Sequence, residues 1–370
     1  MKKAIICSQS DFTTDYRIHK MARTLTVAGY EVSFLGRRHP HHTKEQGERT
    51  HLMKLLFYKS ALFYAEFNIR LFLYLLFHKR VDLVVSIDLD TLLGCVVGTG
   101  MKRERLMFDS HEYFPEVPEI ARKRVIKWAW RKIQDICVPK VDICVTVCES
   151  IADIFYERYG RRFIVVRNVP LTERAKQVAA RSEYRKSGNE PFTILYQGAV
   201  NIGRGLEEMI MAMKSLEGCR LVVVGDGDIM EEVKELVRAE GVGDRVSFEG
   251  RKPFDELAVY MARADVGIVF TKDMCLSYHL SLPNRIFDFI QACLPIVCNR
   301  LPEVERIVEG SKVGHCIESI TVPEIVEAIR TSMGNPDLLA EWKTNARRLR
   351  DSLTWEIEAR KLRTVLEQTK

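Results

Sequence analysis

The feature of this sequence that most constrains its fold is the regular alternation of short, β-branched apolar runs with segments of helical period. In the first half of the chain, helical segments separate strand-like runs at residues 3–8, 31–36, 81–88, 105–110 and 141–148. The pattern restarts in the second half, with runs at residues 192–198, 219–227, 245–250 and 265–270. Short strands that alternate with helices are typical of parallel βαβ units. The sequence therefore predicts an α/β protein with two doubly wound, Rossmann-like domains that face one another across a ligand-binding cleft.

Length and local composition predict the domain boundaries. A chain of 370 residues exceeds the usual size of a single hydrophobic core, so two domains are expected. Residues 171–190 are charged and poor in large apolar side chains. We therefore expect an N-terminal domain at residues 1–170, a linker at 171–190, a C-terminal domain at 191–350 and a final amphipathic helix within 351–370.

Charge and cysteine content narrow the classes of function. The formal net charge of +6 is mildly basic, which suits an anionic small ligand or an anionic membrane surface. This charge is too diffuse over the chain to indicate a nucleic-acid partner, so none is expected. The ten cysteines contain no C-x-x-C pair, and we expect reduced, buried thiols. The first apolar run is too short for a signal peptide, so the expected location is the cytoplasm.

The apolar segment at residues 52–80 bears on membrane contact. Its apolar run is interrupted by Lys54, Lys59, Glu66 and Arg70, so it does not reach the ~20 apolar residues that a membrane-spanning helix needs. Two interpretations remain open. The segment forms a core helix or helix pair, or it forms a basic amphipathic surface that contacts the inner face of a membrane peripherally.

Glycine-rich turns follow three successive strand-like runs in the second half. The first turn carries Arg204 and leads into a helix, and its glycines are Gly198, Gly203 and Gly205. Glycines let the backbone approach a ligand, while a helix N-terminus and a guanidinium both bind diphosphate. The next two turns are Gly225-Asp226-Gly227 and Gly250-Arg251. We expect the three turns along one rim, although ordinary tight turns beside a solvated arginine have the same pattern.

The stretch LSLPNRIFDFIQACLPIV, residues 280–297, predicts a helix with an anion-binding start. Ser281 is the expected N-cap and Pro283 the expected first helical residue, because proline lacks the amide proton. The free amides of that turn would face an anion. Asp288 lies on the same face as Asn284 and Arg285 and is placed to accept hydrogen bonds from ribose hydroxyls. The alternative is an exposed Arg285–Asp288 ion pair, which contributes little.

Together these motifs resemble the retaining glycosyltransferases of the GT-B fold, family 4. That family carries G-R-x-x-x-x-K-G, and here Arg204 stands at the lysine position and Ala199 at the arginine position. Its V-G-x-G turn is similar to residues 224–227, its F-x-G turn to residues 248–250, and its P-N-K-x-F-E element to residues 283–288. The first acid of the family's E-x7-E pattern is Leu280 here, or lies near His279 if the register shifts.

The resemblance implies roles for particular residues. Donor diphosphate contacts are expected from Gly198, Arg204, Gly205, Pro283, Asn284 and Arg285. Ribose and base contacts are expected from Asp288, Gly225, Asp226, Gly227, Gly250 and Arg251. The D-x-H-E segment supplies the candidate catalytic residues His111 and Glu112, with His111 contacting the donor sugar and the attacking hydroxyl. Asp15 and Arg17 occupy the family's first loop and offer acceptor-side polar contacts.

The resemblance also implies the reaction. A sugar moves from a UDP- or GDP-linked donor to a saccharide or lipid-linked hydroxyl acceptor, with retention of configuration, no cofactor and no essential metal. The final helix is expected to cross back to the N-terminal domain. Two alternatives remain: a nucleotide-sugar 2-epimerase of the same architecture, and a nucleotide-binding protein with a degenerate site. A dehydrogenase is disfavoured because no strand leads into G-x-G-x-x-G.

Overall fold

The structure is a computed structural model that describes residues 1–13, 15–39, 49–181 and 190–368. The chain divides into two compact units. The first comprises Met1–Asn168 together with Glu358–Lys370, and the second comprises Val169–Ile357. The C-terminal residues therefore belong to the first unit.

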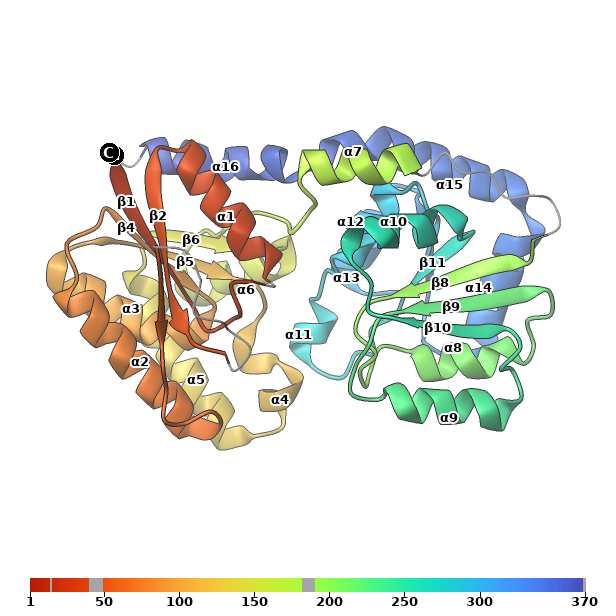
Figure 1. The fold of residues 1–370 in the computed structure, drawn as a ribbon, viewed down its shortest axis with the longest axis horizontal. Coiled ribbons are helices and arrows are strands. Elements are labelled where there is room, and N and C mark those ends of the chain that lie inside the picture. Colours follow the sequence, from red (N-terminus) through yellow and green to blue (C-terminus); the bar gives the residue numbers. More distant parts are fainter. Residues whose placement is uncertain (14, 40–48, 182–189, 369–370) are drawn as a thin grey trace. The chain divides into compact units, whose positions relative to one another are not determined.

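The first unit is built on a parallel seven-stranded sheet of order β3-β2-β1-β4-β5-β6-β7 (Figure 1). Its strands are β1 (Lys2–Ser8), β2 (Tyr30–Arg37), β3 (Thr50–Met53), β4 (Leu83–Ile87), β5 (Arg105–Ser110), β6 (Ile143–Thr146) and β7 (Ile164–Val165). Its α-helices are α1 (Tyr16–Val27), α2 (Ser60–Phe77), α3 (Leu89–Lys102), α4 (Pro118–Ala121), α5 (Arg124–Cys137) and α6 (Glu149–Tyr159), and most of α16 (Trp355–Gln368) belongs here too.

The second unit is built on a parallel six-stranded sheet of order β10-β9-β8-β11-β12-β13. Its strands are β8 (Phe192–Gln197), β9 (Cys219–Val224), β10 (Val246–Gly250), β11 (Val266–Val269), β12 (Ile296–Asn299) and β13 (Gly314–Ile317). Its α-helices are α7 (Thr172–Arg181), α8 (Leu206–Met213), α9 (Met230–Glu240), α10 (Phe254–Arg263), α11 (Leu276–His279), α12 (Arg285–Gln291), α13 (Pro302–Val308), α14 (Val322–Gly334) and α15 (Pro336–Leu349).

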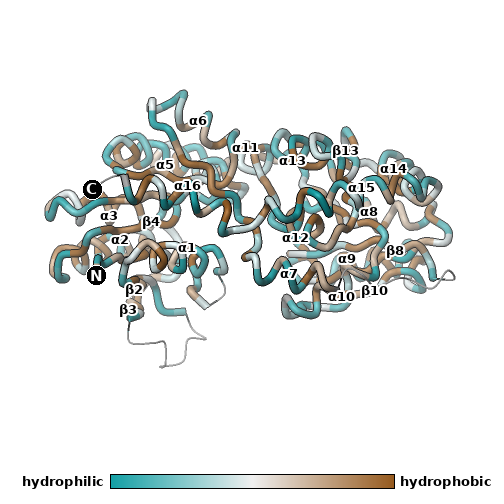
Figure 2. Tube along the Cα trace, turned by 90° about the horizontal axis from the view of Figure 1, so that it is seen from above, coloured by the Kyte–Doolittle hydropathy of each residue, from teal (hydrophilic) through white to brown (hydrophobic). Residues whose placement is uncertain are grey.

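Strand order reverses at β1 in the first sheet and at β8 in the second. In doubly wound sheets, ligands bind beyond the carboxyl ends of the strands at such a switch point. The buried strands are hydrophobic along their length, as β4 shows in Figure 2, because both faces of a parallel sheet are covered. The expected α/β class with two Rossmann-like domains is confirmed.

Two local expectations were wrong. Residues 172–181, expected within a linker, form helix α7, which packs on α10 and α12 and buries Ala175 and Val178. Small apolar residues at helical spacing carry this contact, so the absence of large side chains was misleading. The rest of the expected linker at 182–189 lies outside the described residues. Residues 50–53 form β3, which pairs with β2, rather than the beginning of a helical region.

The thiols of all ten cysteines are free, and nine of the cysteines are buried. Burial raises the pKa of Cys137 and of Cys144 to about 11, so both stay protonated at neutral pH.

The apolar segment at 52–80 contains one long helix. Lys54 and Lys59 precede α2, which contains only the charged pair Glu66 and Arg70, 2.8 Å apart. Within the described residues, α2 is therefore the one helix long and apolar enough to cross a membrane by length and composition, contrary to the expectation. Its buried stripe of Phe63, Phe67, Leu71 and Leu75 nevertheless packs inside the first unit.

Candidate functional site

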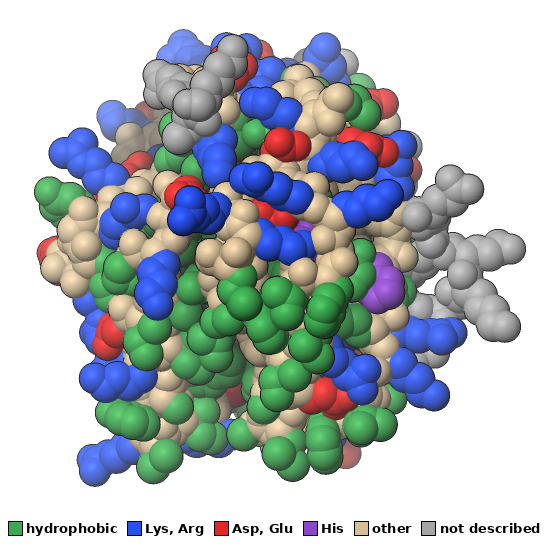
Figure 3. Space-filling model, turned by 90° about the vertical axis from the view of Figure 1, so that its left-hand side faces the viewer, with side chains coloured by type: hydrophobic (Ala, Val, Ile, Leu, Met, Phe, Trp, Pro, Cys, Tyr) green, Lys and Arg blue, Asp and Glu red, His purple; other side chains and the backbone are tan. Residues whose placement is uncertain are grey.

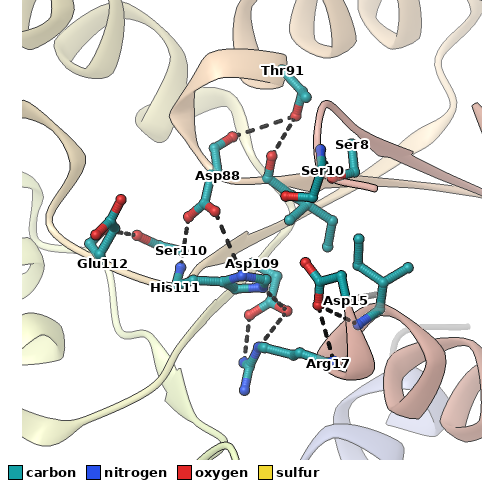
Figure 4. Close-up of polar contacts among 12 residues, drawn as sticks. Ser8, Ser10, Asp15, Arg17, Asp88, Thr91, Asp109, Ser110, His111 and Glu112 are labelled. Atoms are coloured by element: carbon teal, nitrogen blue, oxygen red, sulfur yellow. Dashed lines mark hydrogen bonds and ion pairs between the residues drawn. The ribbon is translucent and has the colours of Figure 1, made fainter. Parts of the chain in front are cut away.

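The first unit gathers polar side chains at the carboxyl ends of β4 and β5 (Figure 4). Asp109 is the second-to-last residue of β5, His111 follows that strand, and Asp88 follows β4. The His111 Nε2 atom is 3.1 Å from Asp109 Oδ2, and the His111 backbone N–H donates to Asp88 Oδ1 at 2.8 Å. The other ring nitrogen, Nδ1, lies 3.5 Å from Asp88 Oδ2. The imidazole is thus held between two carboxylates.

Arg17, in the first turn of α1, also belongs to this cluster. Its contacts differ from the expected acceptor-side role. Its guanidinium donates to both carboxylate oxygens of Asp109, at 3.0 and 2.6 Å, and to the Val166 carbonyl at 2.8 Å. Both side chains are buried, with 2% and 0% exposed. Arg17 therefore fixes Asp109 and does not face an acceptor. Asp15 caps α1 by accepting from two backbone N–H groups at 3.0 and 3.3 Å, so its carboxylate already has a structural role.

The ionisation of the cluster follows from burial and pairing. Burial alone would lower the pKa of His111, but the Asp88 and Asp109 carboxylates raise it above its ordinary value. Burial alone would raise the pKa of Asp109, but Arg17 and His111 hold it well below its usual range. Because carboxylates face both ring nitrogens, the doubly protonated imidazolium is favoured. His111 is then a cation, partly exposed, rather than a free general base.

Asp88 and Asp90 form a D-x-D sequence of a kind that is common by chance, and they were not among the expected site residues. Asp88 instead sits at φ +56°, a conformation that L-residues rarely adopt, and contacts His111. Asp90 is buried, and its Oδ1 has no hydrogen-bond partner among the described residues. Burial, with Asp88 nearby, raises the pKa of Asp90 well above its usual range, which favours the neutral form of this carboxyl. Asp88 and Asp90 come directly after the apolar run of β4, and this position was the available sequence signal for a functional role. Glu112, expected to be catalytic, is exposed and outside the cluster.

In the second unit, the three glycine turns lie together at the carboxyl ends of β8, β9 and β10. The Gly198 N–H donates to Val224 O at 3.0 Å, and the Gly225 N–H donates to Gly250 O at 2.9 Å. Gly225 has φ +152°, and a Cβ there would lie 1.8 Å from the Gly198 carbonyl oxygen. The expected common rim exists, and close packing of one turn on another requires glycine there.

Two cations lie beside these turns. The Arg204 Nη1 is 3.3 Å from Thr271 Oγ1, and its guanidinium stacks 4.7 Å from the Tyr278 ring centroid. Lys272, which sequence analysis missed, lies 2.7 Å from Glu208. A lysine two residues beyond the end of an expected strand was the available signal. Gly205 precedes α8 at φ +67°, where a Cβ would lie 2.7 Å from Phe270.

The structure corrects the expected role of Arg285. Its side chain is buried, donates to the carbonyls of Gln197 and Phe270 at 3.0 and 3.1 Å, and lies 5.2 Å from the Tyr196 ring centroid. The Nη1 and Nη2 atoms of Arg285 therefore join the ends of β8 and β11, which gives this residue a structural role that the sequence did not indicate. Burial lowers its pKa from the usual arginine value. The alternative exposed Arg285–Asp288 pair is equally excluded by this burial.

Helix α12 begins at Arg285, two residues later than expected. Asn284 is the N-cap, so Pro283 precedes the helix instead of being its first residue. The Ser281 hydroxyl is buried and has no partner among the described residues, so it does not cap the helix. Pro283 and the exposed Asn284 still lie where the chain enters α12. Proline is tolerated at several positions before and at the start of a helix. Pro283 alone therefore could not identify the first helical residue.

Asp288 lies one turn inside α12 and is partly exposed. The Gln197 Nε2 donates to Asp288 Oδ2 at 3.4 Å. Gln197 is buried, and its Oε1 has no hydrogen-bond partner among the described residues. A buried acceptor of this kind calls for a water or ligand donor. These groups can together accept from and donate to hydroxyls.

The remaining predicted residues lie on the second and third glycine turns or at the end of α11. Asp226 and Arg251 are both exposed and lie 3.7 Å apart as a solvated ion pair, while Gly227 packs against the Val200 carbonyl. Leu280, where the family pattern has its first acid, is buried at 6% exposure. The neighbouring His279 Nδ1 contacts Asp273 at 2.8 Å. Neither register therefore has an acid at the first acid position itself, although the Asp273 carboxylate lies beside His279.

Family comparisons match each half of the chain. Residues 16–169 match the family described as Glycosyltransferase Family 4, and residues 180–349 match Glycosyl transferases group 1. The chain is 22% identical over 157 residues to alpha-D-kanosaminyltransferase of Streptomyces kanamyceticus (41% of this chain, 39% of the relative). It is 26% identical over 159 residues to GDP-mannose-dependent alpha-(1-6)-phosphatidylinositol monomannoside mannosyltransferase of Mycobacterium tuberculosis (41% of each). The matched region thus spans about two fifths of these relatives.

Solved structures share the fold. Sucrose-phosphate synthase from Thermosynechococcus elongatus superposes with a TM-score of 0.74 at 16% identity, covering 100% of this chain and 99% of that one. HepE of Anabaena in complex with UDP gives 0.76 at 12% identity, covering 100% of both chains. These likenesses extend over both units and confirm the expected GT-B class.

Proposed function

Because the chain belongs to the glycosyltransferases of the group 1 and family 4 type, we propose that it transfers a sugar from a nucleoside-diphosphate sugar to a hydroxyl group of an acceptor. The observation that supports this proposal is the arrangement at the carboxyl ends of the second sheet. Three glycine turns, joined by backbone hydrogen bonds, lie there beside Arg204, Lys272 and Asp288. Cations suit the diphosphate, and a carboxylate suits ribose hydroxyls. The relatives named above, one of them GDP-mannose-dependent, and the UDP complex of HepE support this class of donor.

The proposed reaction breaks the bond between the anomeric carbon and the diphosphate oxygen. A bond from that carbon to the acceptor oxygen forms on the same face, which gives retention, and the hydroxyl proton passes to the departing diphosphate. Negative charge grows on the diphosphate, so Arg204 and Lys272 stabilise the transition state more than the ground state. These two side chains supply the charge that a metal would otherwise supply, and we propose that the reaction needs neither a metal nor a cofactor.

The His111 cluster has a proposed role with the transferred sugar. Held as an imidazolium by Asp88 and Asp109, His111 can donate a hydrogen bond to a sugar hydroxyl. Arg17 and Asp109 act as positioning residues that keep the ring in this orientation. We propose saccharide or lipid-linked acceptors, a cytoplasmic location, and peripheral membrane contact by the surface that includes α2.

The decisive experiment is transfer from UDP- and GDP-sugars with purified protein, in chelator, with the Arg204→Ala variant and the Arg238→Ala control. Arg238 is an exposed residue of α9 whose only ion-pair contact among the described residues is a weak one at 3.9 Å. We expect Arg204→Ala to lower turnover about 10²-fold and the control to leave it unchanged. Full activity of Arg204→Ala would reject the diphosphate assignment. Sugar isomerisation without acceptor would indicate an epimerase, and activity lost only in chelator would reject metal independence.

One observation favours a second candidate. The absence of an acid at Leu280 and of an arginine at Ala199 fits a protein that binds nucleotide without transferring sugar. Calorimetric nucleotide binding with no transfer across a broad acceptor panel would establish this second function.

A further inference from the structure

The first unit carries a large apolar groove between α2, α3 and α5. Its volume is about 800 Å³, and it is lined by Tyr64, Ile69, Phe72, Val97, Ile126 and Ile133, among other mainly apolar residues. Grooves of roughly 300–1,000 Å³ accommodate small-molecule ligands. None of the residues assigned above to the His111 cluster or to the nucleotide edge lines it.

The groove is open because α2 uses only one stripe to pack. Gly94 and Gly98 of α3 bring the two helices close together. A Cβ on Gly94 would lie 2.8 Å from the Asn68 carbonyl oxygen, and one on Gly98 would lie 2.7 Å from Leu75 Cβ. The opposite stripe of α2, which includes Leu62, Ile69 and Leu73, is exposed. Amphipathic helices in soluble domains show the reverse arrangement, with polar residues outward.

Helix α5 extends this apolar surface. Val125, Ile126 and Trp128 are 78%, 45% and 61% exposed, so these apolar side chains face water in the isolated chain. Figure 3 shows hydrophobic side chains gathered on this side of the molecule with Lys and Arg side chains around them. We call the outward residues of α2 and α5, with the groove between them, the docking face. Contiguous exposed apolar surface of this kind marks an interaction site.

The charge around α5 identifies the kind of partner. Residues 122–140 contain seven basic residues and one acid, a net charge of +6 that equals the formal net charge of the whole chain. Lys127 and Arg131 pair with Glu116, and Asp135 pairs with Arg158. Arg122, Lys123, Arg124 and Lys132 make no ion pair among the described residues. Glu119 is the one acid among the groove residues.

A bilayer containing anionic lipid matches both properties. Its headgroups attract the unpaired cations, and its hydrocarbon covers the apolar side chains, with Trp128 at the interface. A nucleic acid would match the charge but leave the groove and the exposed aliphatic side chains in water. We propose that the docking face binds an anionic bilayer surface and that the groove receives the hydrocarbon chain of a lipid. This inference rests on, and deepens, the membrane contact in the proposed function.

The first test is co-sedimentation with vesicles of phosphatidylcholine alone and of phosphatidylcholine mixed with phosphatidylglycerol. We expect binding only to the mixed vesicles, and weaker binding in high salt. A variant with Arg122→Gln, Arg124→Gln and Lys132→Gln should bind roughly 10²-fold more weakly, since each basic residue contributes about fivefold. The matched control carries Lys214→Gln, Lys234→Gln and Arg238→Gln in the second unit. Equal binding of both variants would overturn the proposal.

The second test uses lipids brominated on the acyl chain as quenchers of tryptophan fluorescence. Of the four tryptophans, Trp130, Trp342 and Trp355 are buried and Trp128 is exposed. We expect quenching that weakens in Trp128→Phe, where Trp130 of the groove still reports the bound chain, and that also weakens in Ile69→Glu, while the exposed control Val27→Glu behaves as wild type. Quenching unaffected by either substitution would overturn the groove assignment.

Two further readouts separate the alternatives. Light scattering without lipid reports whether the face binds a second copy of the chain instead, which a dimer lost in Ile69→Glu would show and which would overturn the lipid assignment. Nucleotide binding by each variant is measured in parallel. Variants that lose vesicles but bind nucleotide as wild type does support the docking face, whereas wild-type protein that binds vesicles but no nucleotide refutes only the proposed donor site.

Discussion

Replacing Arg17 with methionine tests whether this residue is a buried support of His111 or an acceptor contact. The substitution removes the charge and keeps a side chain of similar length. In the structure it breaks the two hydrogen bonds to Asp109, at 3.0 and 2.6 Å, and the one to Val166 O at 2.8 Å. Asp109 then remains fully buried, and His111 is its one remaining side-chain hydrogen-bond partner among the described residues.

The size of the effect follows from burial. Removing one partner of a buried ion pair costs about 3–5 kcal/mol, because the other charge is left uncompensated. Asp109 keeps its contact with His111, which puts the expected loss near 3 kcal/mol. In a unit of about 180 residues, each kcal/mol lowers the melting temperature by about 2–4 °C, so we expect a decrease of roughly 6–12 °C.

The assay is urea and thermal unfolding of wild type, Arg17→Met, and the double variant Arg17→Met/Asp109→Asn. The double variant should recover part of the lost stability, because it leaves no unpaired buried charge. Arg158→Met is the matched control. Arg158 also forks onto a carboxylate, Asp135, at 2.9 and 3.1 Å, but that pair is about one third exposed and should contribute only about 0–1 kcal/mol.

A particular result would refute this reasoning. If Arg17→Met unfolds like wild type but raises KM for acceptor alone, then Arg17 faces the acceptor, as the sequence suggested. If Arg17→Met and Arg158→Met lose stability equally, burial is not what makes the Arg17 pair matter.

Three further predictions concern the two sites. Because the pKa of His111 is raised, its charge stabilises the folded state fully below about pH 6.5, and this contribution is lost as the pH rises through the folded-state pKa. Asp88→Asn should lower the pKa of His111, which NMR titration of the imidazole would measure. An unchanged titration would contradict the pairing of His111 with Asp88. Gly225→Ala should lower nucleotide affinity at least tenfold, as titration calorimetry would show, because the added Cβ has no room. The control Gly218→Ala also has positive φ but open space around it, so it should change the free energy of unfolding by only about 1–2 kcal/mol. Asp288→Asn should weaken UDP or GDP binding about tenfold or more but leave a nucleotide without ribose hydroxyls unaffected; equal losses for both nucleotides would remove the ribose role.

The sequence predicted the sheets well because hydrophobic runs flanked by turns report directly on buried parallel strands. It predicted the location of sites at strand ends for the same reason, since Gly198, Gly225 and Gly250 each follow such a run. Which side chains remain available to a ligand depends on tertiary contacts that no spacing reveals. Arg285 and Arg17 look like ligand-binding arginines in the sequence, yet both are buried against carbonyl oxygens from distant strands.

The failure to predict Lys272 and Asp88 as site residues also has a physical cause. Lys272 belongs to no recognisable motif and Asp88 only to the common Asp88-x-Asp90 pattern, and only the fold brings them beside Glu208 and His111. The charge of α5 was visible in the sequence as part of a helical period, but its exposure beside the open stripe of α2 was not. Helix packing through Gly94 and Gly98 decides which stripe is covered.

The most direct test of the central claim is isothermal titration calorimetry of UDP and GDP with the intact chain. The account predicts saturable one-site binding of at least one of them, weakened about 10²-fold in Arg204→Ala and unchanged in Arg238→Ala. Absence of binding by both nucleotides, or equal affinity in Arg204→Ala and wild type, would contradict the assignment of the second unit as the donor-binding unit.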